Sequence, residues 1–420
     1  MVPMLPSADD PSRGQRTGLM QRLRGLRWNR PAPLRLKTVA VVIASVLGCQ
    51  AMAASRLTRS PVAVVMPDGL QGAKQVFLQG LRLGEESVLA CRADAPALDL
   101  HSLPGDADPA SLFPRGTNGT PILPPLLVAP YAADLDTYGR LADAGDAQLI
   151  LGHQRGSSLD RLQRLESRSR LWPLLPAHRD DWQALAEGTI SRGWTRVHVV
   201  RDPSIDADRA IDFVTLFEEL GGEVLSYTEQ KVQLLTGDSP EHLARLDQDI
   251  AWLGPDALVV AADPDGDLVR QLRQRQEQDV AGRRLAWIWL LSAHRSRHLP
   301  AQDWTQLALE QPAQGPAWSS FADAFLRRWG TEPGLMAAAG FETARVLALT
   351  MAGPLPLASD GRRDPLGWLD PSAEPQELCG AIAHRRSGQA TRLRGVASDF
   401  ALRPGQAPSG TAKVRLVAAE

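Results

Sequence analysis

The sequence predicts an α/β protein in which short parallel strands alternate with amphipathic helices. Two observations predict this class. From residue 60 onward, short apolar runs such as 61–66 alternate with longer segments whose apolar residues recur every three or four positions. The composition, 44% hydrophobic and 22% charged over 420 residues, is that of a globular protein with room for two domains. Such alternation is typical of parallel sheets covered by helices.

The first elements follow from periodicity and turn residues. Residues 61–66 (PVAVVM) predict a strand, and Pro67-Asp68-Gly69 predicts a turn. Residues 71–85 predict a helix, because their apolar positions fall on one face. Residues 91–121 are rich in proline, glycine, aspartate and serine and show no period. We therefore expect a long irregular insertion there.

After the insertion the predicted elements follow one another closely. Apolar runs predict strands at residues 122–129, 147–152, 171–175, 196–200, 223–227, 257–262 and 285–291, with a β-like pattern at 400–417. Apolar residues in helical phase predict helices at 135–144, 158–168, 181–192, 208–220, 239–253, 267–278, 319–329 and 334–351. Gly221-Gly222 is expected to end one helix and Ser239 to cap the next.

Composition and motifs exclude several classes of protein. The balance of 46 basic and 48 acidic residues argues against a nucleic-acid binder, which would carry a basic face. Disordered chains, coiled coils, collagens and multi-span membrane proteins are excluded by composition. No nucleophile elbow, phosphate-binding loop, dinucleotide fingerprint or zinc-protease motif occurs. We expect no enzyme, no catalytic residue, no cofactor and no metal site.

The N-terminal segment, residues 1–54, has the pattern of an export signal. Its first 37 residues carry eight basic and two acidic side chains, and an uncharged apolar run, 38–48, follows. That run is shorter than the about 20 residues that span a bilayer. Cleavage after Ala51-Met52-Ala53 would give a soluble chain, whereas Val46-Leu47-Gly48-Cys49 is similar to a lipobox and would give a chain lipidated at Cys49. Both alternatives, and an uncleaved anchor, stay open.

Cys91 and Cys379 remain once the export segment is set aside. They could pair in an oxidising compartment. Two buried free thiols are the alternative, which we favour slightly because 288 positions separate the two cysteines and the sequence gives no geometry.

Three segments, in this order, carry a family likeness. The first is residues 191–202 (SRGWTRVHVVRD) with 217–224 (FEELGGEV), the second is 254–262 (GPDALVVAA), and the third is 321–333 (FADAFLRRWGTEP) leading into 337–351. Together they resemble type I periplasmic substrate-binding proteins of the leucine- and amide-binding kind, which serve ABC importers. The likeness spans about residues 120–355, with weaker matches at 60–85 and in the tail.

The resemblance implies two α/β lobes joined by three crossovers, with a small ligand held between them. On this basis lobe one would combine residues 60–188 and 304–353, and lobe two 189–303 and 354–420. The ligand cleft would lie at the carboxyl ends of parallel strands, where helix N-termini offer free N–H groups to an anion. An ABC permease is the implied partner, and the periplasm or cell envelope is the implied location.

The loop Gly152 to Ser158 is the best candidate for ligand contact by resemblance. Ser157 and Ser158 open a predicted helix, so their hydroxyl and backbone N–H groups could hold a ligand carboxylate; the alternative is a simple N-cap. Arg155 could add charge-assisted bonds to an anion, although a solvated loop arginine is the commoner use.

Further candidates follow later strands. Asp202 follows the strand at 196–200, where the aromatic residue of many relatives is missing, and Asp263 follows the strand at 257–262, in what could equally be a plain turn. His294 lies in a basic run, 292–298, at the place where amino-acid binders carry an acid; this change favours an anionic ligand, unless the run is only a surface loop.

Trp172, Trp287 and Trp289 are the aromatic candidates for the cleft, although tryptophan in a strand is more often in the core. The sequence thus predicts an exported receptor for a small polar or anionic ligand, such as an amino acid or amide, that serves an ABC importer. The alternative is an envelope lipoprotein of the same fold that binds a cell-wall synthase or another protein and no small ligand.

Overall fold

The protein is described here by a computed structural model. The chain divides into two compact units, residues 1–58 and 59–420. The described residues all belong to the second unit: they are 62–418 without 70, 95–97, 105–106, 130–132, 156–158, 160–161, 228, 292, 359–360 and 362–363. The predicted export segment, its cleavage sites and Cys49 lie outside the described residues. Within them, no helix is both long and apolar enough to cross a membrane.

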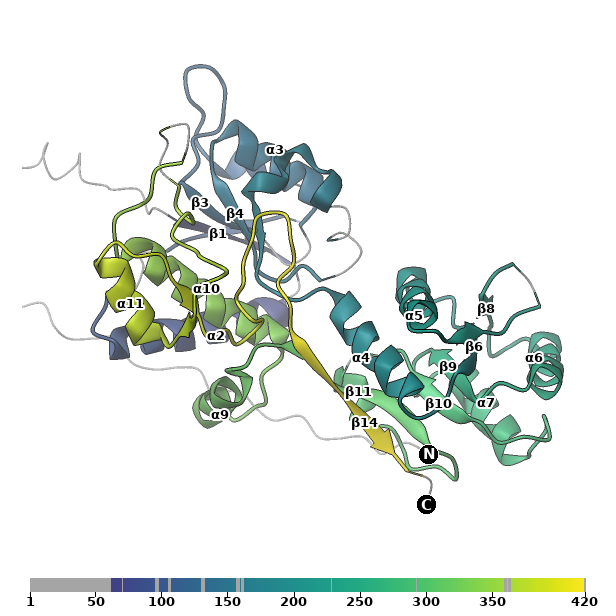
Figure 1. Cartoon of the computed structure of the whole chain (residues 1–420). Coiled ribbons are helices and arrows are strands. Elements are labelled where there is room, and N and C mark those ends of the chain that lie inside the picture. Colours follow the sequence, from purple (N-terminus) through teal and green to yellow (C-terminus); the bar gives the residue numbers. More distant parts are fainter. Residues whose placement is uncertain are drawn as a thin grey trace, which may run out of the picture. The chain divides into compact units, whose positions relative to one another are not determined.

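The first sheet is entirely parallel and has the strand order β2-β1-β3-β4-β5 (Figure 1). Its strands are β1 (Val62–Pro67), β2 (Asp99–Leu103), β3 (Leu126–Ala129), β4 (Gln148–Leu151) and β5 (Leu171–Pro173). The sheet is buried on both faces, as the side chains of β1 illustrate. Val62, Val64 and Met66 enter one core and Ala63 and Val65 enter the other, because successive side chains point to opposite faces.

Helices cover both faces of the first sheet. α2 (Gln71–Ala90), α9 (Trp318–Trp329), α10 (Leu335–Met351) and α11 (Leu378–Arg386) contribute to the core on one face. α3 (Leu135–Ala144), with the 3-10 turns η1 (Pro109–Leu112), η2 (Leu162–Arg164) and η3 (Glu166–Arg170), covers the other face. We call this sheet and its two cores lobe one.

The second sheet has the order β14-β11-β10-β9-β6-β7, and β8 also pairs with β6. Its strands are β6 (Arg196–Arg201), β7 (Glu223–Val224), β8 (Val232–Leu234), β9 (Ala257–Ala261), β10 (Ala286–Trp289), β11 (Gln306–Gln314) and β14 (Thr411–Val417). All described pairs are parallel except β11 with β14. α4 (His178–Ile190) and α5 (Ala207–Glu219) pack on one face, and α6 (Pro240–Leu253) and α7 (Asp267–Glu277) on the other. This is lobe two.

The chain passes between the lobes three times in its described part. The first crossover, residues 174–177, leads from β5 of lobe one to α4 of lobe two. The second, residues 315–317, leads back from β11 of lobe two to α9 of lobe one. The third leads from the segment before residue 403 in lobe one to β14 of lobe two. This topology confirms the predicted two-lobed α/β fold with three crossovers.

The predicted lobe boundaries need correction at each crossover. α4, predicted in lobe one, packs in the core of lobe two through Trp182, Leu185 and Ala186. β11, also predicted in lobe one, lies in the second sheet; its sequence QLALEQPAQ holds a glutamate and a proline, and we predicted no strand there. Residues 366–402, predicted in lobe two, carry apolar side chains that complete the core of lobe one.

Three local predictions also differ from the structure. The insertion at 91–121 contains β2, which extends the first sheet, and η1, whose N-cap Asp108 accepts from the Ala110 N–H. The predicted helix at 158–168 is represented in its described part by the 3-10 turns η2 and η3. The β-like pattern at the end of the tail 400–417 corresponds to β14, whereas α8 (Ala293–Ser296), α11, β12 (Pro375–Gln376) and β13 (Arg392–Leu393) were not predicted.

A disulfide joins Cys91 to Cys379, with their Cα atoms 5.1 Å apart. The slightly favoured expectation of two free thiols was therefore wrong. Cys91 follows the end of α2 and Cys379 lies in α11, which both belong to lobe one. Sequence separation carried no information here, because the chain passes through most of lobe two, from α4 to β11, before it returns to lobe one.

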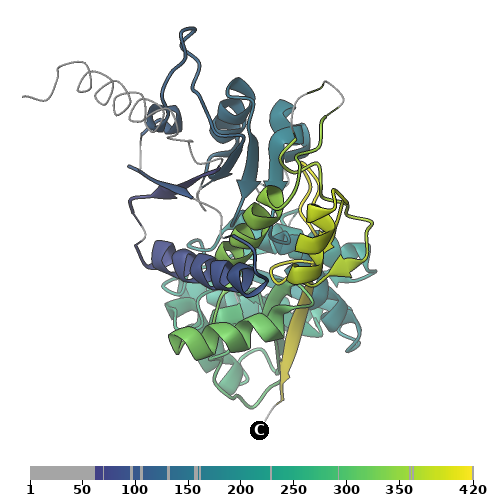
Figure 2. The ribbon, with the colours of Figure 1, turned by 90° about the vertical axis from the view of Figure 1, so that its left-hand side faces the viewer.

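α2 and α10 run side by side at unusually close range (Figure 2). Three glycines allow this approach. A Cβ atom on Gly80 would overlap the Ala337 carbonyl oxygen, one on Gly340 would overlap the Phe77 carbonyl oxygen, and one on Gly84 would lie 2.6 Å from the Phe341 carbonyl oxygen. The two backbones thus meet directly, as glycine alone permits.

Replacing Gly340 by alanine should destabilise the protein by about 1–3 kcal/mol, because the new methyl group forces the two helices apart. Gly72→Ala in α2 is the matched control, since nothing lies within 4 Å of the point that its new Cβ atom would occupy. That variant should be neutral or up to about 1 kcal/mol more stable, as alanine favours a helix. Urea unfolding of both variants would test this, and equal stabilities would contradict the close packing.

Loss of the disulfide should also lower stability. Cys91→Ser with Cys379→Ser is expected to cost about 2–5 kcal/mol, because the crosslink restricts the unfolded chain. Thermal melts with and without dithiothreitol provide the measurement. Reductant should lower the melting temperature of the wild type and leave the double variant unchanged; a wild type insensitive to reductant would mean that the bond does not form.

Candidate ligand-binding site

A cavity of about 970 Å³ lies where elements of both lobes meet. Several helices contribute residues at or near their N-termini: His178, Asp181 and Trp182 from α4, Arg209 from α5, Trp318 from α9, and Gly334 and Leu335 from α10. The first N–H groups of a helix have no partner within the helix and carry partial positive charge. The cavity therefore has a wall suited to an anion.

Another wall of the cavity comes from two strands of lobe two. Leu309 to Pro312 and Gln314 of β11 line the cavity, together with Arg415 of β14. The ladder between these strands shifts register between Leu309 and Gln311 and again between Gln311 and Gln314. Such bulges change the direction in which side chains point. Leu291, Arg297 and His298, from the segment after β10, complete this wall.

Arg155 and Asp181 form a buried ion pair at the edge of the cavity. Their side chains are 7% and 5% exposed, and Arg155 Nη2 lies 3.0 Å from Asp181 Oδ2. Arg155 Nε also donates to the Pro176 carbonyl at 2.7 Å, and the Ala313 N–H donates to Asp181 Oδ1 at 2.5 Å. Burial raises the pKa of Asp181, while Arg155 acts against that rise. Arg155 is thus a buried partner of Asp181 and not a solvated loop arginine.

This pair connects the crossovers. Arg155 binds residues 176 and 177 of the first crossover, and Asp181 binds Ala313 at the end of β11, just before the second. The adjacent Asp180 accepts from the Gly410 N–H at 2.9 Å, where the third crossover enters β14. Two neighbouring carboxylates at the start of α4 therefore hold the backbone of two further chain segments.

His178 lies uncharged among cations. Burial, with the positive charges of Arg155 and Arg209, lowers the pKa of His178 to about 3. Burial and Arg155 likewise lower the pKa of His153 to about 4. His178 packs edge-on against Trp182, with ring centroids 6.1 Å apart. At neutral pH this imidazole offers one donor and one acceptor and adds no positive charge.

Only some of the charged side chains that line the cavity form ion pairs with one another. Arg155 pairs with Asp181, and Arg297 pairs with Glu332. Arg415 Nη2 donates to the Ser296 carbonyl at 2.9 Å. Among the described residues, Arg209, Arg415 and Glu310 have no ion-pair partner, although all three line the cavity. Two cations and one anion of the described lining therefore lack an ion-pair partner.

The predicted site residues are only partly brought together. Arg155 lines the cavity, whereas Ser157 and Ser158 lie outside the described residues and so does the side chain of His294. Asp202 and Asp263 do not line the cavity. Asp202 accepts from the Ser204 N–H at 2.8 Å within its own turn. Asp263 pairs with Arg295 at 2.7 Å.

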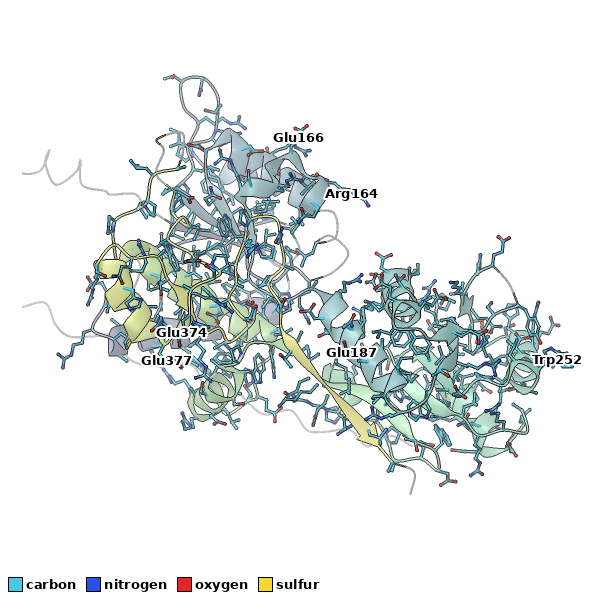
Figure 3. The ribbon with its side chains drawn as sticks, viewed as in Figure 1. Arg164, Glu166, Glu187, Trp252, Glu374 and Glu377 are labelled. Carbon is cyan, nitrogen blue, oxygen red and sulfur yellow. A yellow bond between two sulfur atoms is a disulfide. The ribbon has the colours of Figure 1, made fainter. Side chains whose placement is uncertain are left out.

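The tryptophans lie in three kinds of place: in the cores, at the surface and in the cavity lining. Trp172, Trp287 and Trp289 are buried in the cores, and each donates through its indole nitrogen to a glutamine. The core alternative for these three is therefore confirmed. Trp252 is 82% exposed and lies at the outer end of α6 (Figure 3). The tryptophans that line the cavity, Trp182 and Trp318, were not singled out from the sequence.

Most residues of the cavity were missed, because they are spread over the chain from 155 to 415. His178, Asp181, Trp182, Arg209, Gln314 and Arg415 belong to no shared motif. One signal was available: Arg209 lies near the start of a predicted helix that follows a strand of the parallel sheet. Such positions face the carboxyl edge of a sheet, where ligands bind in open α/β folds.

Comparison with known proteins identifies the fold. No known family model matches the sequence, and no curated protein matches it either. Among solved structures, a branched-chain amino acid ABC transporter protein from Rhodospirillum rubrum matches with a TM-score of 0.56 and 16% identity over 86% of this chain and 97% of that chain. The chain has the fold of type I periplasmic binding proteins. The likeness found in the sequence is thus confirmed at the level of the fold.

Two further solved structures agree with this assignment. A branched-chain amino acid ABC transporter periplasmic ligand-binding protein from Burkholderia xenovorans matches with a TM-score of 0.52 and 11% identity, over 84% of this chain and 89% of that chain. An ABC transporter substrate-binding protein from Desulfitobacterium hafniense, solved in complex with Leu, matches with a TM-score of 0.51 and 14% identity, over 84% and 96%.

Breaking the buried pair should be costly. Asp181→Ala leaves Arg155 charged and unpaired and removes the acceptor of the Ala313 N–H, so we expect a loss of about 3–5 kcal/mol in unfolding free energy. The double variant Arg155→Met, Asp181→Leu removes both charges and should lose less than Asp181→Ala. Chemical denaturation measures both.

The exposed pair Arg179–Glu219, which joins α4 to α5, is the matched control. Arg179→Ala should change stability by less than about 1 kcal/mol, because water screens both groups. An Asp181→Ala variant as stable as this control would show that the buried pair does not hold the crossovers.

Proposed function

We propose that this protein is an exported receptor that binds a small carboxylate-bearing ligand in the cavity between its lobes and presents it to an ABC permease. The observation that carries the proposal is the presence of Arg209 and Arg415, without carboxylate partners among the described residues, in a cavity that helix N-termini also line. A carboxylate would supply the missing charge.

The size of the cavity supports a small ligand. About 970 Å³ lies at the upper end of the range of about 300–1,000 Å³ typical of small-molecule sites. Trp182, Trp318 and Leu335 supply apolar surface beside the charged groups. A ligand with one anionic group and an apolar part fits this lining better than a sugar, which would need many neutral polar partners.

Export and the importer partner rest on three observations together. The N-terminal segment has the pattern of an export signal, and the Cys91–Cys379 disulfide is typical of an oxidising compartment. The structural relatives are ABC transporter proteins, and one of them was solved with Leu. We therefore place this protein in the periplasm or cell envelope, with Cys49 as the residue of a lipid anchor if the lipobox is used.

A ligand screen tests the function. The purified protein would be melted in the presence of pooled amino acids, amides, hydroxy acids, aromatic carboxylates, amines and sugars. A ligand at 100 times its Kd should add about 2.7 kcal/mol to the unfolding free energy. No shift from any pool would overturn the proposal and favour the partner-binding alternative, in which a cell-wall synthase or another envelope protein would co-purify.

Arg209→Gln should weaken binding of a carboxylate found in this way by about tenfold or more, since a charge-assisted hydrogen bond is lost. Arg270→Gln is the matched control, because Arg270 lies in the first turn of α7, pairs with Asp267 and does not line the cavity. Isothermal titration would measure both. Equal affinities of the two variants would remove Arg209 from the site. Ser157 and Ser158 remain candidates for the same carboxylate.

A further inference from the structure

A groove separate from the ligand cavity lies on the surface of lobe one, where α2 and the end of α9 lie side by side (Figure 2). Its volume is about 330 Å³, and six side chains of α2 line it together with Trp329 of α9. None of these residues lines the cavity between the lobes. The groove is therefore a second surface, to which the proposed receptor function gives no use.

The six side chains of α2 form two parallel rows. Residues four positions apart in a helix lie one above the other on the same face. Each row has three members at this spacing: Lys74, Leu78 and Arg82 in one, and Gln71, Gln75 and Gln79 in the other. The first row offers two cations with an apolar residue between them, and the second row offers amide groups.

Leu78 and Trp329 give the groove an apolar part. Both are half-buried and pack against the core of lobe one. The Arg328 Cζ atom lies 4.7 Å from the centroid of the Trp329 ring, and Arg328 Nε lies 3.3 Å from Glu86 Oε1 in α2. These contacts hold the indole ring at the groove, so a side chain that enters would cover apolar surface there.

The groove carries positive charge that no lining carboxylate neutralises. Lys74 Nζ donates to a neutral partner, Ser102 Oγ, at 2.9 Å, and Arg82 has no ion-pair partner among the described residues. Burial raises the pKa of Glu85 and Arg82 acts against that rise, yet Glu85 does not line the groove. An acidic occupant would therefore supply the missing charge.

The spacing of the two cations fits an extended segment. Lys74 and Arg82 are eight positions apart in α2, which places them about 12 Å apart along the helix axis. In an extended chain, residues at alternate positions share a face, and residues four positions apart are about 13 Å apart. A segment with acid, apolar residue and acid at alternate positions would thus meet Lys74, Leu78 and Arg82 in turn. A flat anionic bilayer would reach the cations but not the half-buried Leu78 between them.

We propose that this groove binds an extended segment of a partner protein with the pattern acid-x-apolar-x-acid. Lys74 and Arg82 each bind one carboxylate, and the apolar side chain packs on Leu78 and Trp329. The glutamine row hydrogen-bonds to the backbone of the segment. This inference goes beyond the proposed function, because it concerns a protein partner and a surface outside the ligand cavity.

Short peptides test the pattern. The probe is GSETLTEGS, labelled with a fluorophore at its N-terminus and amidated at its C-terminus; its threonines favour an extended chain. GSTELETGS has the same composition and charge but places leucine on the face opposite the glutamates, and GSQTLTQGS lacks the charges. Anisotropy titrations of the purified full chain at about 50 mM salt should show the probe binding at least about fivefold more tightly than either control peptide.

Substitutions locate the site. Lys74→Gln with Arg82→Gln should weaken the probe by about tenfold or more, because both ion pairs are lost. Arg140→Gln with Arg270→Gln is the matched control: it removes the same charge from two exposed arginines of α3 and α7 that do not line the groove. This control should bind the probe as the wild type does.

Charge reversal separates direct contact from a structural effect. Lys74→Glu with Arg82→Glu should lose the probe and bind GSKTLTKGS, in which lysines replace the glutamates. A structural effect of the two side chains would weaken both peptides alike. Melting temperatures close to that of the wild type would show that each variant is folded.

The outcomes are distinct. Equal affinities for the probe and GSTELETGS overturn the pattern, and an unchanged affinity of the Lys74→Gln, Arg82→Gln variant overturns the groove as the site. If the probe does not bind, while phosphatidylglycerol vesicles bind the wild type and not this variant, the cations serve a lipid surface and the protein partner is overturned.

The ligand screen remains separate from this test. The Lys74→Gln, Arg82→Gln variant should keep any melting shift that a ligand pool gives, because neither residue lines the cavity. Peptide binding by a protein that responds to no ligand pool would support the groove and overturn only the receptor function.

Discussion

The ion pair between Arg155 and Asp181 is the interaction on which the arrangement of the crossovers depends. Taking both charges out of water is costly, so the pair is stable only because each group also has backbone partners. Pro176 lies in the first crossover, and Ala313 lies at the end of β11, just before the second crossover. Asp180 adds Gly410 of a third segment. The start of α4 is therefore the point where the crossovers are held.

The alternation of strands and helices was sufficient to predict the fold, because a parallel sheet covered on both faces requires apolar strands between amphipathic helices. The prediction failed for segments whose structure depends on tertiary packing and not on the periodicity of their apolar residues. β11 contains Glu310 and Pro312 and has a bulged register, so its strand pattern is weak. Residues 366–402 contain little regular structure, yet the buried Glu342 of α10 accepts from the Val396 and Ala397 N–H groups and holds this segment on lobe one.

The candidate site was less predictable than the fold. The sequence pointed to Arg155, but it gave no sign that Arg155 would form a buried ion pair with Asp181, 26 positions later. Asp202 and Asp263 follow strands as predicted, yet their carboxylates satisfy local partners, Ser204 and Arg295. A residue that directly follows a strand lies at the edge of the sheet. The direction in which its side chain points depends on the turn that follows. Only tertiary structure reveals which polar groups are left without partners.

The lining of the cavity links ligand binding to the movement of the lobes. α9 and α10 of lobe one supply part of it, and α4, α5, β11 and β14 of lobe two supply another part. A ligand can shift the relative population of two conformations only by its difference in affinity for them. Contacts within one lobe give no such difference, because they stay the same when the lobes move. A ligand that contacts Arg209 of lobe two and the N-terminus of α10 in lobe one at the same time does, because the distance between these groups changes with the lobes.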